Sequence, residues 1–140
     1  PLSYPKKNKY IDEVINYGEQ IFGEKFIPLT NFISKESYEN FISEKIDIAI
    51  MASWRGHGLG TITSLLASNA KVYLDSSSPS YKWFCKQGIK ISSLADLKTE
   101  VQLNKIEKIS TKVAAVNNKI VTQHFSKYNL LESLNKIWTN

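Results

Sequence analysis

The chain has 140 residues, of which 42% are hydrophobic and 22% are charged, and its net charge is +5 at pH 7. This composition excludes a disordered, charge-dominated chain, and the length suits one domain that can bury a core. The longest apolar runs are far shorter than the ~20 residues of a bilayer-spanning helix, so no membrane span is expected. The positive charge suits an anionic partner, although the lysines are spread along the chain, which disfavours nucleic acid. The positive charge fits a phosphorylated small molecule or an acidic membrane surface as the partner. It equally fits an ordinary basic surface that is only solvated.

The N-terminal third predicts a helix, a strand and a second helix. Asn8 can cap a helix that Gly23 ends, and residues 26–29 form a short extended piece. Ser34 can then cap the next helix. Residues 46–51 are nearly all apolar and rich in β-branched side chains. That pattern predicts the core strand of a sheet that helices cover on both faces.

Helices and strands keep alternating after this point. A turn with several glycines precedes an apolar helix over residues 59–66, and a strand follows at residues 71–74. Pro79 starts the next helix and Gly88 stops it, after which residues 89–91 predict another strand. This alternation predicts a single α/β domain over residues 1–140, with a Rossmann-like open parallel sheet and helices on both faces.

The C-terminal part is less regular. Ser93 and Asp96 have the spacing of a capping box, whereas residues 98–112 are charged and show no clear period. Residues 115–140 read as a helical tail with a break near residues 126–129.

For three polar or reactive side chains, the sequence predicts a structural role and not a catalytic one. Cys85 is the only cysteine, so it excludes an internal disulfide, and we expect it to be a small buried hydrophobe on a helix. His124 should pack on the inner face of its helix. Asp47 should lie within the core strand and pair with a strand end or a backbone group. The sequence shows no metal-ligand spacing and no paired catalytic groups, so no metal is expected.

Ligands of open parallel sheets bind beyond the carboxyl ends of the strands, and one loop there suits a diphosphate. Its glycines let backbone N–H groups approach an anion at a helix start, Arg55 can contact phosphate with two hydrogen bonds, and His57 and Thr61 add donors. The predicted diphosphate site comprises Arg55, Gly56, His57, Gly58, Gly60 and Thr61. The Gly-x-Gly-x-Gly spacing matches neither the dinucleotide fingerprint nor the Walker loop. Alternatively, the small residues only permit tight helix–strand packing.

Four segments, residues 26–34, 46–66, 71–74 and 84–91, together resemble the donor half of GT-B glycosyltransferases. More narrowly, they resemble the bacterial 4-alpha-L-fucosyltransferase family, which includes enzymes that transfer N-acetylfucosamine from TDP to lipid II. Residues 2–4, 10–15 and 26–29 follow the family's order. Arg55 and Gly60 match its Asn-Arg-Gln-Gln turn and Gly-Asn helix start, whereas their neighbours depart from it.

The resemblance implies a nucleotide-sugar donor domain with no metal and no other cofactor. It places the nucleobase near Phe32 and Ile33 and the diphosphate at the Arg55 turn. It places the sugar near Asp75, Ser76, Ser77 and Ser78. Ser3 and Tyr4 would line the cleft toward an N-terminal acceptor domain that this chain lacks, and the catalytic base would lie on that domain.

The donor implied by this resemblance is a fucose-like sugar linked to TDP or GDP, and the acceptor is a glycan or a lipid-linked glycan. The chain begins without Met or a signal peptide, so we expect a fragment of a larger protein that is inactive alone. We expect that protein in the cytoplasm, peripheral on the inner face of the cytoplasmic membrane. Two other classes stay open. Asp75 closes a strand as the ribose-binding acid of an NAD-dependent oxidoreductase would, and a non-catalytic α/β interaction module fits the same pattern.

Overall fold

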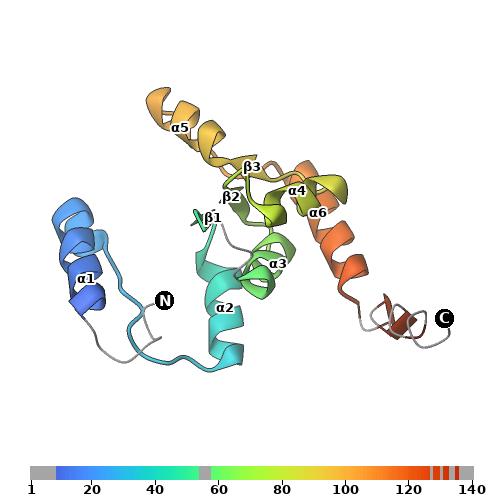
Figure 1. Cartoon of the computed structure of the whole chain (residues 1–140), viewed down its shortest axis with the longest axis horizontal. Coiled ribbons are helices and arrows are strands. Elements are labelled where there is room, and N and C mark those ends of the chain that lie inside the picture. Colours follow the sequence, from blue (N-terminus) through green and yellow to red (C-terminus); the bar gives the residue numbers. More distant parts are fainter. Residues whose placement is uncertain (1–8, 54–57, 127, 130, 133–134, 136–140) are drawn as a thin grey trace. The chain divides into compact units, whose positions relative to one another are not determined.

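The computed structural model describes residues 9–53, 58–126, 128–129, 131–132 and 135 (Figure 1). The chain divides into two compact units, Pro1–Tyr38 and Glu39–Asn140.

The N-terminal unit is built around helix α1 (Lys9–Phe22), which ends in a 3-10 turn, η1 (Gly23–Lys25). Gly23 has a φ of +55°, a backbone conformation that favours glycine, so the expected helix stop at this residue is confirmed. The ring of Phe26 then lies directly on the helix, because a Cβ atom added to Gly18 would be 2.4 Å from it. Gly18 therefore permits this close packing.

The strand expected at residues 26–29 is not formed. Phe26 has extended backbone angles, but these residues pair with no strand among those that the structure describes. A strand needs a partner for its backbone groups, and local sequence does not reveal whether one is present. Helix α2 (Lys35–Lys45) follows, and the Ser34 hydroxyl accepts a hydrogen bond from the Ser37 amide at 3.2 Å, which confirms the expected cap.

The described residues of the C-terminal unit form a parallel sheet of three strands in the order β1-β2-β3: β1 (Ile48–Met51), β2 (Lys71–Leu74) and β3 (Ser92–Ser93). The middle strand, β2, is the most buried, since Val72, Tyr73 and Leu74 are each at most 2% exposed. Successive side chains of a strand point to opposite faces, so both faces of β2 are covered. The sequence prediction that residues 46–51 form the core strand is wrong: β1 lies at an edge of the described sheet, and Ile50 is 55% exposed.

Four helices surround this sheet: α3 (Leu59–Ala67), α4 (Pro79–Lys86), α5 (Leu94–Gln102) and α6 (Thr111–His124) (Figure 1). Helix α3 packs against α6 and β2, whereas α5 contacts β2 and β3. The hydroxyl of Ser93 and the carboxylate of Asp96 form the predicted capping box of α5. The unit therefore has the predicted α/β fold, with a sheet and helices consistent with a Rossmann-like open sheet.

The last strand is shorter than expected and begins later in the chain. Residues 89–91 are not a strand, and β3 covers only Ser92–Ser93. Asn117, a buried residue of α6, explains this difference. Its side-chain oxygen accepts from the Lys90 N–H at 2.8 Å, and its side-chain nitrogen donates to the Lys90 carbonyl at 2.7 Å. The backbone of Lys90 is thus satisfied by an amide side chain instead of by a neighbouring strand.

Candidate functional site

The predicted donor site lies at the carboxyl edge of the sheet. Met51 pairs with Leu74 in the register of β1 and β2, so both strands end at the same place. The two loops that follow these strands therefore leave from one edge, as the prediction requires. Gly58, Gly60 and Thr61 belong to the first of these loops and the start of α3, and the residues from Asp75 to Ser78 form the second.

The other residues of the prediction are either outside the described residues or in the N-terminal unit. Arg55, Gly56 and His57, and likewise Ser3 and Tyr4, lie outside the described residues. Phe32 and Ile33, the expected nucleobase contacts, belong to the N-terminal unit, where Phe32 is 76% exposed.

Helix α3 starts at Gly58 without a side-chain cap. Helices α4, α5 and α6 differ, because a serine hydroxyl accepts a hydrogen bond from the first turn of each. Gly58 has a φ of +74°, and a Cβ atom added there would lie 3.1 Å from the Cε atom of Met51. Glycine is therefore needed at Gly58 for both conformation and space.

Gly60 has a different environment. A Cβ atom added to Gly60 would meet no atom within 4 Å in the part of the chain that the structure describes. Tight helix–strand packing, the alternative interpretation of these glycines, therefore does not account for Gly60. The N–H groups of a first helical turn have no partner within their own helix, and such groups can bind an anion.

The second loop is a tight polar turn held by its own side chains. Oδ1 of Asp75 accepts hydrogen bonds from the Ser77 hydroxyl at 2.7 Å and from the Ser77 amide at 2.8 Å. These two bonds lower the pKa of Asp75 below its ordinary value. Ser78 is only 1% exposed, and its hydroxyl accepts from the Tyr81 amide to cap α4. Ser78 thus serves the fold, whereas Ser76 remains exposed.

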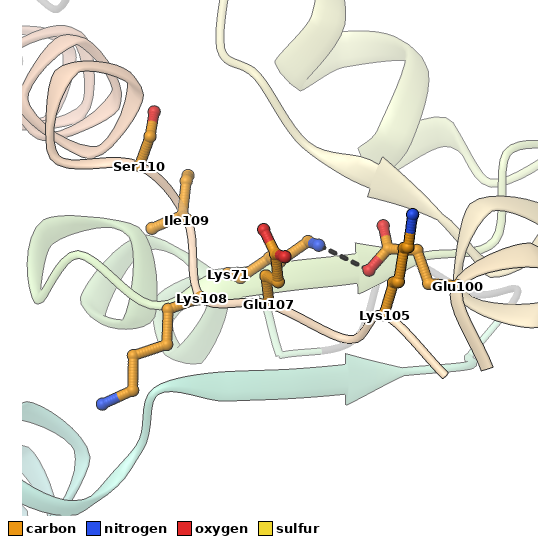
Figure 2. Close-up of a pocket in the computed structure, with 7 residues that line it drawn as sticks. All are labelled: Lys71, Glu100, Lys105, Glu107, Lys108, Ile109 and Ser110. Carbon is orange, nitrogen blue, oxygen red and sulfur yellow. Dashed lines mark hydrogen bonds and ion pairs between the residues drawn. The ribbon is translucent and has the colours of Figure 1, made fainter. Parts of the chain in front are cut away.

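An open polar cleft of about 430 Å³ lies at the opposite, amino edge of the sheet (Figure 2). Lys71, Glu100 and the connection from α5 to α6 line it. Figure 2 shows Lys71 and Glu100 pointing toward each other, with Nζ 2.7 Å from Oε2. The same carboxylate oxygen accepts from the buried Tyr73 hydroxyl at 2.6 Å. The hydrogen bonds from Lys71 and Tyr73 to Glu100 connect β2 to α5. The sequence predicts no ligand in this cleft.

The three groups of this network change one another's acidity. The hydrogen bonds from Lys71 and then from Tyr73 lower the pKa of Glu100. Burial raises the pKa of Tyr73, and its hydrogen bond to Glu100 raises it further. Burial alone lowers the pKa of Lys71, but its hydrogen bonds to Glu100 and Tyr73 outweigh that effect and raise it. Near neutral pH, the folded state therefore favours a charged Lys71–Glu100 pair beside a neutral Tyr73.

We expect acid to weaken the fold through Glu100. Because its pKa is lowered in the folded state, its contribution is complete above the unfolded pKa of about 4.3 and is lost as pH falls through the folded pKa. Urea unfolding between pH 3 and pH 7 should show that Glu100→Gln is less stable at pH 7 and has a shallower acid slope. Glu107→Gln removes an exposed carboxylate of the same cleft and is the control. Identical slopes for the natural chain and Glu100→Gln would refute this role.

Three further side chains were interpreted from the sequence alone. Cys85 is exposed on α4, so the expectation of a buried hydrophobe is wrong; Phe84, beside it, is the buried residue of this helix. The His124 ring packs edge-on against Trp83, with centroids 5.1 Å apart, although the residue stays exposed. Asp47 precedes β1 and is not part of it. The expected place of Asp47 within the strand is therefore wrong. Its exposed carboxylate pairs with the Lys108 side chain at 2.7 Å, and its backbone carbonyl accepts from the Lys71 amide.

No protein-family model, curated protein or solved structure matches the chain. In the described part of the chain, no helix combines the length and the apolar character that crossing a membrane requires. Among the same residues, no three histidine, cysteine or acidic side chains gather as metal ligands would.

Proposed function

We propose that this chain is the donor-binding domain of a glycosyltransferase. In this proposal it binds a nucleotide diphosphate sugar with a fucose-like deoxy-sugar, for transfer to a glycan or a lipid-linked acceptor. The observation that carries the proposal is the start of α3, which follows β1: a helix N-terminus without a side-chain cap, where no atom of the described residues lies within 4 Å of a Cβ added to Gly60. The resemblance of residues 46–66 to GT-B donor domains supports the same site.

The chemistry follows from the helix start. Backbone N–H groups and the positive end of the helix dipole stabilise a bound diphosphate. They stabilise it more as negative charge grows on the leaving nucleoside diphosphate, which lowers the barrier to transfer without a metal ion. Arg55 and His57 would add hydrogen bonds from the preceding turn. The acceptor site and the catalytic base would lie on a separate N-terminal domain, and the basic surface would suit an anionic membrane face.

The two glycines give a matched test of the site. Gly60→Ala should preserve the fold, because alanine favours helix and its methyl group enters open space. It should nevertheless weaken binding of TDP or GDP, because that methyl group occupies the space through which the phosphates approach. Gly58→Ala should instead destabilise the fold by about 1–2 kcal/mol, because its left-handed conformation disfavours a side chain.

The measurement is a titration of TDP and GDP followed by the backbone amide signals of residues 58–62. We expect shifts in the natural chain and at least about tenfold weaker binding by Gly60→Ala, the equivalent of ~1.4 kcal/mol. Unchanged nucleotide binding by a folded Gly60→Ala would contradict the placement. A response to NAD(H) but not to TDP or GDP would favour the oxidoreductase, and silence toward all three would favour an interaction module.

A further inference from the structure

We infer that the chain forms a dimer through helix α1, which pairs in antiparallel orientation with α1 of a second copy. This inference concerns the N-terminal unit and does not depend on the proposed donor site. Its starting point is an open groove of about 440 Å³ along α1, whose walls are side chains of the helix and the ring of Phe26. Most of the residues that line this groove are apolar or aromatic.

Helix α1 has two apolar faces, and only one of them is buried. Ile11 and Gly18 belong to the buried face, where the ring of Phe26 packs on Gly18. The second face is a stripe of residues spaced by four, three and four positions: Tyr10, Val14, Tyr17 and Ile21. The two tyrosines and the isoleucine of this stripe are each 57–67% exposed. Large apolar side chains that gather on one exposed face are typical of a binding surface.

The spacing of the stripe indicates what kind of surface covers it. Alternating steps of four and three residues are those of the a and d positions of a coiled coil, where the partner is another helix. An anionic membrane is a poorer partner, because α1 carries three acidic residues and a single lysine. Anionic lipids would repel this helix. The stripe therefore fits a helix in preference to a lipid surface.

The sizes of the stripe residues favour a second copy of α1 in antiparallel orientation. In that arrangement, Tyr10 lies opposite Ile21 of the second copy, and Val14 lies opposite Tyr17 of the second copy. Each layer then combines one aromatic and one aliphatic side chain, which fills the seam evenly. A parallel pair would instead place tyrosine on tyrosine and valine on valine, so that crowded layers alternate with loosely filled ones.

The polar edge of the stripe fits the same orientation. Glu13 and Gln20 are both exposed, and they flank the stripe on one side of the helix. In an antiparallel pair, Glu13 of each copy lies beside Gln20 of the other, so that the carboxylate accepts a hydrogen bond from the amide. The ion pair that Glu13 makes with Lys9 spans 3.7 Å between exposed side chains, which leaves the carboxylate accessible.

The area of the surface sets the expected strength of the dimer. A buried aromatic side chain contributes about 150–250 Å². Four large side chains, Tyr10, Tyr17, Ile21 and Phe22, are each more than half exposed. Two copies together can therefore bury on the order of 1,000 Å², which is the lower limit for a specific interface. We expect a reversible dimer that dissociates on dilution.

The test is sedimentation equilibrium of the full chain from about 1 μM to about 500 μM, the range in which an interface of this size associates. The mass should rise from that of a monomer toward that of a dimer. Tyr17→Lys puts an ammonium group into the seam and should raise the Kd at least about tenfold. Asn16→Lys adds the same charge one position away, on the exposed polar face, and should leave the Kd unchanged. Circular dichroism verifies that both variants are folded.

A third variant tests the orientation. Gln20→Lys brings an ammonium group beside Glu13 of the other copy at both ends of an antiparallel pair. Two exposed ion pairs should lower the Kd by about twofold to tenfold. A parallel pair keeps these two positions of different copies two helical turns apart, so the same substitution would bring no gain.

Each result either supports or overturns the inference. A monomer at every concentration overturns it, and so does a dimer whose Kd is the same in Tyr17→Lys. A dimer that Gln20→Lys does not strengthen overturns the antiparallel pairing. Vesicles of neutral phosphatidylcholine provide the last comparison: if the monomer binds them and Tyr17→Lys does not, the stripe is a membrane surface and the inference is overturned. None of these measurements requires a nucleotide, so they are independent of the proposed function.

Discussion

Replacing Asn117 with Leu should destabilise the C-terminal unit by roughly 2–4 kcal/mol. The Asn117 side chain is the hydrogen-bond partner of both backbone groups of Lys90, and the residue is only 1% exposed. Leucine has a similar size and favours helix more than asparagine, so the substitution removes the hydrogen bonds without a large cavity. The N–H and C=O of Lys90 would lose their partners. Both hydrogen bonds are partly buried, and each group left unsatisfied there costs about 1–3 kcal/mol.

Asn118 provides the control for this experiment. It is the same residue type, one position further along α6, and its side chain donates to the carbonyl of Ala67. Asn118→Leu removes a single hydrogen bond from a half-buried position, so we expect a smaller loss, about 1 kcal/mol. Chemical unfolding of the two variants gives both values. If Asn117→Leu is no less stable than Asn118→Leu, the Lys90 backbone does not depend on this amide.

Local signals in the sequence predicted several elements correctly. Ser78 and Pro79 start α4, Ser93 and Asp96 form the capping box of α5, and Gly88 ends a helix with a φ of +82°. Each of these features depends on residues within three or four positions of one another. Capping and left-handed glycine are therefore visible in a sequence without knowledge of the tertiary fold.

The errors come from partners that are distant in the chain. Asn117 satisfies a backbone 27 residues away, so the Ile-Lys-Ile segment at residues 89–91 looks like a strand although the backbone of Lys90 bonds to a helix. Apolar β-branched residues identified β1 as a strand, but which strand lies in the middle depends on the order of pairing. The placement of Cys85 failed for a related reason, since α4 buries Phe84 and leaves the next side chain exposed.

The sequence predicts which loops form the candidate site, but it does not predict the hydrogen bonds that each side chain makes there. The strand-to-helix turn and its glycines located the carboxyl edge, because strand ends in a parallel sheet share one side. The sequence treated the residues from Asp75 to Ser78 as equivalent sugar contacts. The hydrogen bonds distinguish them: Ser77 holds Asp75, Ser78 caps α4, and the second oxygen of Asp75 stays available. A serine directly before Pro79 predicts the N-cap of α4. Nothing in the sequence predicts the hydrogen bonds between Asp75 and Ser77.

The largest single loss of stability should come from Phe84→Ala. Phe84 is fully buried at 0% exposure, and its ring lies edge-on to Trp83 with centroids 5.0 Å apart. Its removal should cost about 3–5 kcal/mol, because the lost burial and the remaining cavity add together. Phe84→Leu keeps most of the volume and should cost less, about 1–2 kcal/mol.

The Phe84→Ala and Phe84→Leu variants also separate effects on the fold from effects on the proposed donor site. Helix α4 begins at the Ser78 cap, so the turn that holds Asp75 is continuous with the helix that Phe84 anchors. Urea unfolding measures both stabilities, and donor titration under conditions that keep each variant folded measures the site. Because Phe84 is buried away from solvent, the folded fraction of Phe84→Leu should bind donor like the natural chain. A stable Phe84→Ala variant would contradict the packing of α4. Weak donor binding by a fully folded Phe84→Leu would show instead that α4 sets the position of the Asp75 turn through this ring.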